Sequence, residues 1–326
     1  MLKKFGKLTL ILICTLSLLA LGSTGFAADK EFVRMFSGPE GGSWYPLGAA
    51  MMNIVEKNIP AVSTSCGPGG GVGNCKDVQS GRADLGWTYT HTSYNAYNGS
   101  GKFGKEHTKL RHLMSLYPGV FQMAVPKKSD IESVSDLADK RIVPGKVGFT
   151  GTEIAEIILE AHDLTFDSIK KNGGSVSFVG YADSAALMKD GHSDCYMAVT
   201  SCPQSTIIDL NHRPGIRIIG IDDEHMEKVQ ELEPGLMSTE IPEDAYKGMD
   251  GPVQTAGTVT QIVVTEDMSE ELAYKIVKTL WEHRDDLMEV KEKAIKESEL
   301  ENALKGNKIP VHPGAEKYYK EVGVLE

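Results

Sequence analysis

The chain has little positive charge, few cysteines and only one long apolar run. Its 34 lysines and arginines are outnumbered by 45 aspartates and glutamates, which gives a net charge of −11 over 326 residues. Proteins that bind nucleic acid are expected to carry a basic face, so this balance argues against a nucleic-acid partner. It also offers an anionic ligand no long-range attraction, so local dipoles and hydrogen bonds would have to hold such a ligand.

Several catalytic and cofactor-binding motifs are absent from the sequence. It contains neither an HExxH pattern nor a G-x-S-x-G turn. Gly71-Val72-Gly73 lacks the third glycine of the dinucleotide fingerprint, because Lys76 holds that position. The stretch from Gly99 to Glu106 resembles a phosphate-binding loop but has Glu106 where Ser or Thr would reach Mg²⁺. The sequence therefore predicts no metal site and no cofactor, and it does not favour an enzyme.

The long apolar run lies at the N-terminus. Three lysines precede the apolar residues 8–21, and Gly25-Phe26-Ala27 supplies a small-x-small cleavage pattern. This pattern predicts a secretory signal peptide over residues 1–27. A short membrane anchor is the alternative, but the run is too brief to span a bilayer comfortably. We therefore expect a periplasmic or extracellular protein that does not itself span the membrane.

Four cysteines follow the predicted signal peptide. Cys66 and Cys75 flank a Gly/Pro loop that can fold back, so a disulfide between them is plausible in an oxidising compartment. Closing so short a loop would add roughly 2–3 kcal/mol of stability. Cys195 and Cys202 would be too far apart in an extended strand unless the chain turns back, so their state is left open. The alternative for all four is a small buried thiol.

Strand and helix patterns alternate after the signal peptide. Strands are predicted near 32–36, 62–65 and 84–89, and helices near 47–55 and 72–80. This alternation is typical of an α/β fold with a mainly parallel sheet covered by helices. Asp84 and Asp194 each open a predicted strand, for which structural roles are expected rather than catalysis.

A second α/β unit begins near Pro126. Residues 111–125 give two strand-like runs broken at Tyr117-Pro118-Gly119, and a long β-type run over 255–265 is predicted to cross back to the first unit. We therefore expect two α/β domains: domain 1 from 28–125 and 253–326, and domain 2 from 126–252 inserted between them. Two crossing strands would form a hinge, and a ligand would bind in the interdomain cleft at the carboxyl ends of the strands.

Three glycine-rich strand–loop–helix junctions are candidate binding loops: residues 38–44, 66–74 and 148–153. A helix N-terminus presents free backbone N–H groups and a positive dipole end, which suit a carboxylate. Ser43 could cap its helix and also bind a ligand, while Trp44 and Tyr45 could pack on the ligand's carbon chain. Each loop alone could be an ordinary capped turn. Two loops that converge from opposing domains favour a binding cleft.

The order of these motifs resembles the TAXI family of extracytoplasmic solute receptors, and the likeness covers nearly the whole chain after residue 27. The resemblance is carried by Gly41-Gly42-Ser43-Trp44-Tyr45-Pro46-Leu47-Gly48, Ser80-Gly81-Arg82-Ala83-Asp84-Leu85-Gly86, Tyr94-Asn95-Ala96-Tyr97, Gly148 to Glu153, and His312-Pro313-Gly314-Ala315 with Tyr318-Tyr319. It implies a type II periplasmic-binding-protein fold. It also implies a receptor that closes on glutamate, glutamine or a dicarboxylate such as 2-oxoglutarate and delivers it to the membrane permease of a tripartite ATP-independent periplasmic (TRAP) transporter.

The resemblance also implies a set of ligand-binding positions. They are Gly42, Ser43, Tyr45, Gly70, Gly71, Thr90, His91, Thr150, Gly151 and Thr152, to which Ser201 in the later loop is added. The chain departs from the family pattern at Thr90-His91-Thr92, at Val72 and at Ser201-Cys202-Pro203. These departures bear on the identity of the ligand more than on the fold.

Two alternative functions use the same cleft. A secreted hydrolase or cysteine-dependent enzyme would need an activated nucleophile beside a base, for which Ser43 or Cys202 with His91 are the candidates. A receptor of an ATP-driven (ABC) importer could have the same fold and a different membrane partner.

Overall fold

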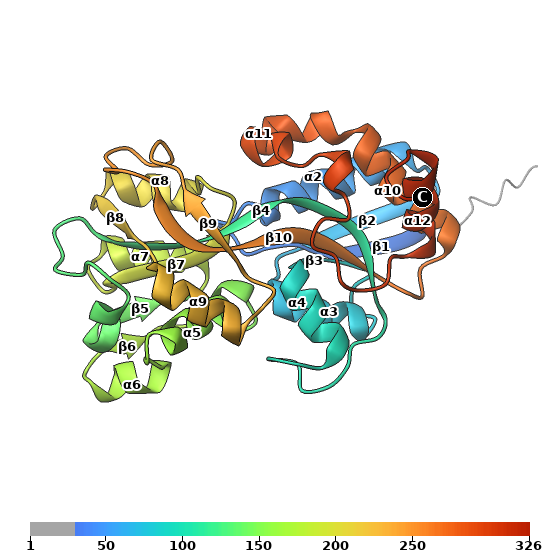
Figure 1. Ribbon diagram of the computed structural model, residues 1–326. Coiled ribbons are helices and arrows are strands. Elements are labelled where there is room, and N and C mark those ends of the chain that lie inside the picture. The colour runs from blue at the N-terminus through green and yellow to red at the C-terminus, as the bar shows by residue number, and fades with distance from the viewer. Residues whose placement is uncertain (1–29) are drawn as a thin grey trace, which may run out of the picture.

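The computed structural model describes residues 30–326, and the predicted signal peptide at residues 1–27 lies outside the described residues. The described strands join in a 10-stranded sheet with the order β2-β1-β3-β10-β4-β7-β5-β6, while β8 pairs with β4 and β9 pairs with β10. Figure 1 shows two lobes, with β4 and β10 running between them. Within residues 30–326, no helix combines the length and the apolar character needed to cross a membrane.

The first lobe contains both ends of the described chain. Strand β1 lies between β2 and β3 and pairs with both in parallel. Helix α2 covers one face of this sheet with α10 and α11, and α3 and α4 lie on the opposite side (Figure 1). Its elements are β1 (Glu31–Phe36), α2 (Trp44–Asn58), β2 (Val62–Gly67), α3 (Gly71–Gln79), β3 (Leu85–Tyr89), α4 (Thr90–Asn98), α10 (Glu270–Glu282), η2 (Arg284–Leu287), α11 (Met288–Lys296), η3 (Leu300–Asn302) and α12 (Pro313–Glu321).

The second lobe repeats the same strand layout. Strand β5 lies between β6 and β7 and pairs with both in parallel, and β4 lies between β7 and β8 as β10 lies between β3 and β4. Its elements are η1 (Ser135–Asp139), β5 (Arg141–Val143), α5 (Thr150–Ala161), α6 (Phe166–Lys171), β6 (Ser175–Val176), α7 (Tyr181–Lys189), β7 (Cys195–Thr200), α8 (Ser205–His212), β8 (Ile216–Ile219), α9 (Asp223–Leu232) and β9 (Met237–Ile241).

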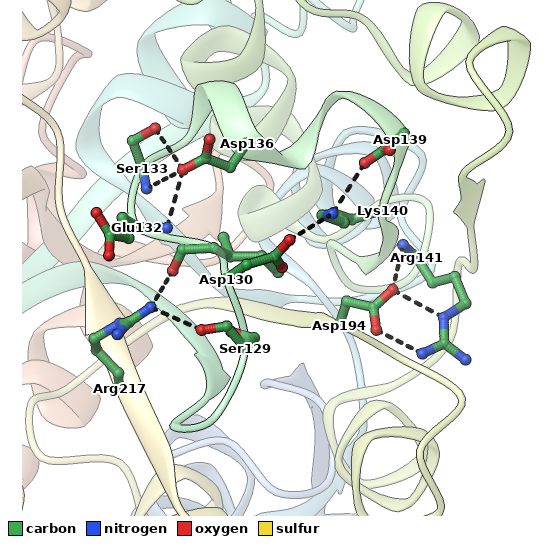
Figure 2. Close-up of polar contacts among 11 residues, drawn as sticks. Ser129, Asp130, Glu132, Ser133, Asp136, Asp139, Lys140, Arg141, Asp194 and Arg217 are labelled. Carbon is green, nitrogen blue, oxygen red and sulfur yellow. Dashed lines mark hydrogen bonds and ion pairs between the residues drawn. The ribbon is translucent and has the colours of Figure 1, made fainter.

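An Arg–Asp contact fixes the equivalent strands in each lobe. In the second lobe Asp194 accepts hydrogen bonds from the backbone N–H and from Nε of Arg141, at 2.9 and 2.8 Å (Figure 2). In the first lobe Asp84 accepts one from the backbone N–H of Arg34 at 2.7 Å. Both aspartates directly precede the third strand of their lobe, so the predicted structural role of these two residues is confirmed.

Strands β4 (Leu110–Pro126) and β10 (Val253–Thr265) connect the lobes. They pair antiparallel with each other from Leu110↔Thr265 to Val120↔Gly257, and each continues into pairings within the second lobe. The predicted crossing strand over 255–265 is therefore confirmed. The expected break at Tyr117-Pro118-Gly119 is wrong, because β4 is continuous there and a register shift in its pairing with β10 accommodates the irregularity.

The predicted Cys66–Cys75 disulfide is absent, and all four cysteines of the described chain are free thiols. Cys66 lies in β2, with its sulfur against Gly48 of α2. Cys75 lies in α3, and its thiol donates to the Thr88 hydroxyl of β3 at 3.4 Å. Helices α2 and α3 cover opposite faces of the sheet (Figure 1). Because Cys66 packs against α2 and Cys75 belongs to α3, the two thiols lie on different sides of the sheet.

Candidate ligand-binding site between the lobes

A cavity of about 20 Å³ lies between the lobes, enough room for about one water molecule. The cleft is therefore closed in this structure. We call this space the inner cavity. Its lining residues are Pro39, Gly42, Ser43, Trp44, Gly70, Gly71 and Tyr89 from the first lobe, and Phe149, Thr150, Gly151, Tyr181, Val199 and Thr200 from the second.

Four helices begin at the inner cavity: α2 at Trp44, α3 at Gly71, α5 at Thr150 and α7 at Tyr181. The first-turn amides of a helix have no acceptor within that helix, and the helix dipole places partial positive charge there. None of the lining residues carries a side chain that is charged at neutral pH. The inner cavity therefore favours a small anion through backbone dipoles and hydroxyl groups, without a basic side chain.

Aromatic side chains form much of the cavity wall. The ring centroids of Trp44 and Tyr89 lie 4.5 Å apart on the first lobe, and those of Phe149 and Tyr181 lie 5.5 Å apart on the second. On the lining residue Trp44, the indole Nε1 is buried and forms no hydrogen bond within the described residues. A buried donor without a partner costs about 1–3 kcal/mol, so a ligand acceptor that reached Trp44 Nε1 would be stabilised.

Ser43 links the two lobes. Its hydroxyl is 2.8 Å from Thr200 Oγ1 and also forms a hydrogen bond with the Ser201 hydroxyl. The expectation that Ser43 caps α2 is wrong, because its side chain makes no capping hydrogen bond. Its oxygen is instead directed across the cleft, which makes it available to a ligand when the lobes separate.

Further hydrogen bonds hold the lobes together around the inner cavity. The Gly41 carbonyl accepts from Thr206 Oγ1 at 2.9 Å and from Gln204 Nε2 at 3.2 Å. The Tyr89 hydroxyl donates to the Val199 carbonyl at 3.1 Å. The backbone N–H of Gly73 donates to the Gly148 carbonyl at 3.1 Å, so the second and third glycine-rich loops contact each other directly.

Glycine is required where these loops meet. A Cβ atom on Gly70 would lie 2.4 Å from Phe149 Cδ1, and one on Gly71 would lie 2.2 Å from Thr150 Oγ1. Within the second lobe, a Cβ atom on Gly151 would lie 2.5 Å from the Tyr181 hydroxyl oxygen. The closed cleft therefore depends on bare backbone at these positions.

The structure places the predicted site residues in several environments. Gly42, Ser43, Gly70, Gly71, Thr150 and Gly151 line the inner cavity, and Ser201 adjoins it through Ser43. Tyr45 is 37 % exposed and does not line it. Thr152 donates to the carbonyls of Lys146 and Pro144 at 2.9 and 3.2 Å, so its hydroxyl holds the loop before α5.

Thr90 and His91 line a different and larger space of about 440 Å³, which we call the side pocket. It also includes Asn95, Glu233 and Lys308. His91 Nδ1 is 2.8 Å from Thr258 Oγ1, and His91 Nε2 is 3.1 Å from Thr92 Oγ1. Burial lowers the pKa of His91 to about 3, so its ring is neutral at physiological pH.

Six lining residues were not named from the sequence, although Pro39 and Phe149 lie within the predicted binding loops; the six are Pro39, Tyr89, Phe149, Tyr181, Val199 and Thr200. Phe149 and Thr200 directly adjoin predicted site residues, so their positions gave a usable signal. Tyr181 could not be predicted as a site residue, because no glycine-rich motif surrounds it. It reaches the cleft only because α7 packs there.

The residues proposed for an enzyme do not form a catalytic arrangement. Ser43 contacts hydroxyl groups of the second lobe, whereas His91 contacts Thr258 and Thr92. Burial raises the pKa of the Cys202 thiol to about 11, so it is not an activated thiolate. Neither candidate nucleophile has His91 as a hydrogen-bonded base.

Two α/β lobes joined by two crossing strands, with a cleft lined from both sides, define the type II periplasmic-binding-protein fold of solute-binding proteins. The chain belongs to the NMT1-like family, whose model matches residues 35–323.

Solved structures of transport proteins resemble this chain. A Streptococcus mutans structure, from a study of glutathione import through GshT and the cystine ABC importer TcyBC, has a TM-score of 0.50 and 14 % identity over 82 % of this chain and 96 % of the other. A putative L-cystine ABC transporter from Listeria monocytogenes has a TM-score of 0.49 and 13 % identity over 81 % and 96 %. The arginine-, lysine-, histidine-binding protein ArtJ from Geobacillus stearothermophilus has a TM-score of 0.49 and 12 % identity over 84 % and 98 %. The Streptococcus match supports the assignment of the fold.

Proposed function

We propose that this protein is an extracytoplasmic receptor that closes its two lobes on a small carboxylate and delivers it to a membrane importer. In this proposal residues 28–125 with 253–326 form one moving unit, and residues 126–252 form the other. The hinge lies in the paired strands β4 and β10, because these are the strands that run through both lobes.

The observation that carries the proposal is the convergence of four helix N-termini on a cavity without charged side chains. Backbone amides and hydroxyl groups can hold a carboxylate by charge-assisted hydrogen bonds. The lobes must separate for entry, because the closed cavity of about 20 Å³ cannot contain even a small organic acid.

A neighbouring space at the cleft mouth supports a ligand with a second charged group. This space, of about 430 Å³, shares Pro39 and Phe149 with the inner cavity and includes Lys146, Glu40 and Asp183. Lys146 could meet a second carboxylate, and the two acidic side chains could meet an ammonium group. Glutamate, glutamine and dicarboxylates such as 2-oxoglutarate are therefore the first ligands to test.

Two classes of membrane importer are candidate partners of this receptor. The sequence motifs resemble receptors of TRAP transporters, whereas the Streptococcus structure of the same fold comes from work on an ABC importer. The fold comparison thus favours the ABC alternative over the TRAP permease. Uptake of labelled ligand would separate the two: ATP depletion with the ion gradient intact stops an ABC importer, and collapse of the ion gradient stops a TRAP transporter.

A thermal-shift screen of amino acids and mono- and dicarboxylates tests the receptor function. A ligand present at 100 times its Kd stabilises the folded chain by about 2.7 kcal/mol, which gives a clear rise in melting temperature. Small-angle X-ray scattering should then show a more compact particle with that ligand. If no carboxylate shifts the melting temperature, the proposal is wrong.

A further inference from the structure

A cluster of two histidines and an aspartate lies in the second lobe, outside the ligand cleft. His162 follows the last residue of α5, while Asp222 and His225 lie at the start of α9. Each of the three offers one ligand atom, and these atoms all lie within 4.8 Å of one another. We propose that this cluster binds a divalent transition metal of the Zn²⁺, Ni²⁺ or Cu²⁺ type.

The hydrogen bonds of the two imidazole rings prepare them as ligands. His162 Nδ1 is 2.8 Å from the Ile158 carbonyl oxygen, which can only accept, so Nδ1 carries the proton. His225 Nδ1 is 2.7 Å from a carboxylate oxygen of Asp222, and the same argument places its proton on Nδ1. A ring that carries only this one proton has its lone pair on Nε2. Metal-binding histidines commonly donate their other nitrogen to a carbonyl or carboxylate in this way.

The local charge also suits a cation. Three carboxylates, those of Glu224, Asp163 and Asp222, act on Lys228, which pairs with Glu224 at 3.0 Å. With Asp222 behind Nδ1 of His225, the two Nε2 atoms are the protein ligands and water completes the coordination shell. Imidazole donors select transition metals, whereas Mg²⁺ and Ca²⁺ prefer sites built from oxygen alone. The donor set thus predicts that Zn²⁺, Ni²⁺ or Cu²⁺ binds and that Mg²⁺ and Ca²⁺ do not.

Metal binding requires a small rearrangement of the rings. The imidazoles of His162 and His225 are stacked, with centroids 3.8 Å apart and planes inclined by 7°. A metal lies close to the plane of each ring that binds it, so at least one ring must turn out of the stack. His225 lies on the outer helix and is only partly buried, which allows it to move. The bound ion would then connect α5 to α9.

Metal titration of the full secreted chain tests the site. The protein is prepared without a histidine tag and treated with a chelator, and ZnCl₂ is added in a calorimeter. We expect one Zn²⁺ per chain with a Kd in the micromolar range, and no comparable binding of Mg²⁺. His162→Ala and His225→Ala should each weaken binding at least tenfold, and Zn²⁺ should raise the melting temperature of the unmodified chain but not of these two variants.

His192→Ala is the matched control, because His192 is exposed in the same lobe and is not part of the cluster. It should bind Zn²⁺ as the unmodified chain does. A second readout is the histidine ring signals in the NMR spectrum, where those of His162 and His225 should shift together on addition of Zn²⁺. The proposal fails if binding stays in the millimolar range, or if both cluster variants bind as well as the His192→Ala control.

Discussion

The inner cavity and the side pocket lie along the same cleft but differ in construction. The inner cavity is small, uncharged and surrounded by helix N-termini, with glycines from one lobe against side chains of the other. The side pocket has a volume of about 440 Å³ and includes the charged residues Glu233 and Lys308. Both lobes contribute walls to both spaces, but with the lobes closed only the side pocket has room for a solute.

This difference divides the predicted ligand residues into two groups. Ser43 and the glycines stand where closure would enclose an anion, whereas Thr90 and His91 face a space that stays open when the lobes are closed. In the inner cavity, a ligand is contacted from both lobes only when the lobes close. The side pocket keeps a volume of about 440 Å³ with the lobes closed, so contact with a ligand there does not require the last step of closure.

The largest expected effect comes from blocking closure. Gly70→Ala introduces a Cβ atom 2.4 Å from Phe149 and 2.9 Å from the Gly148 carbonyl, both in the opposite lobe. The Gly70 backbone is extended, so alanine is tolerated locally. Overpacking costs about 1–3 kcal/mol, which predicts an affinity loss of roughly 10–100-fold for the cleft ligand, measured by calorimetry.

Gly73→Ala is the control for this variant. Gly73 lies in the same helix, and the nearest atom to its Cβ would be 3.8 Å away. It should bind the ligand as the unmodified chain does. Equal affinities for the two variants would show that the inner cavity does not close on the ligand.

A second prediction concerns the pH dependence of closure. Glu153 on α5 is 5 % exposed, and Gly101 and Lys102 of the first lobe approach it. Burial, and then the charge of Glu233, raises the pKa of Glu153 from 4.5 to about 7, while Lys102 and Lys76 lower it and Glu156 raises it. The closed form therefore binds a proton that the open form releases.

The sign of this effect follows from the raised pKa. Closure is most favourable at low pH, weakens as the pH rises above 4.5, and reaches a constant lower value once the pH exceeds about 7. Ligand affinity should fall by no more than about tenfold per pH unit over that range. Glu153→Gln should flatten the profile, which calorimetry from pH 5 to 8 would detect. An unchanged slope in this variant would assign the pH dependence elsewhere.

A third and smaller effect distinguishes the two spaces directly. Ser43→Ala removes a hydroxyl from the inner cavity, and a hydrogen bond to a charged ligand contributes about 1.5–3 kcal/mol. We expect roughly a tenfold loss of affinity, whereas His91→Asn in the side pocket should change affinity little. The reverse result would move the ligand site to the side pocket.

The smallest effect is expected at the cysteines. Because Cys66 and Cys75 are free thiols, mass spectrometry without reductant should find their peptides unlinked. Cys66, which is only partly buried, should be alkylated before Cys75, because burial raises the pKa of the Cys75 thiol to about 12. A linked pair of peptides would contradict the free thiols of the structure and mean that the loop between them is constrained covalently.

Much of the fold was predictable because it depends on local patterns. Alternating strands and helices and the long run at 255–265 predicted two units and a crossing strand, and the structure has both. The glycine-rich loops could be identified because each lies between a predicted strand and a predicted helix. A segment in that position must be a loop that ends at a helix N-terminus. Asp84 and Asp194 were assigned structural roles from their position before a strand, and both bind the first strand of their lobe.

The remainder depended on packing that sequence distance does not reveal. Cys66 and Cys75 are close in sequence, but the sheet lies between the faces to which they point. Ser43 looked like a helix cap until its partners across the cleft were known. Tyr181 and Tyr89 reach the inner cavity through tertiary contacts, and no motif marks them.

The pairing of β4 with β10 affects how the second lobe binds a ligand that is already held by the first. Because these strands are hydrogen-bonded to each other from Leu110 to Val120, the two lobes are held by ordered backbone at both crossings. When a ligand binds first to one lobe, the other lobe is part of the same molecule and is present at a high effective concentration. The second half of binding is then an intramolecular step, and little conformational entropy remains to be lost when the cleft shuts.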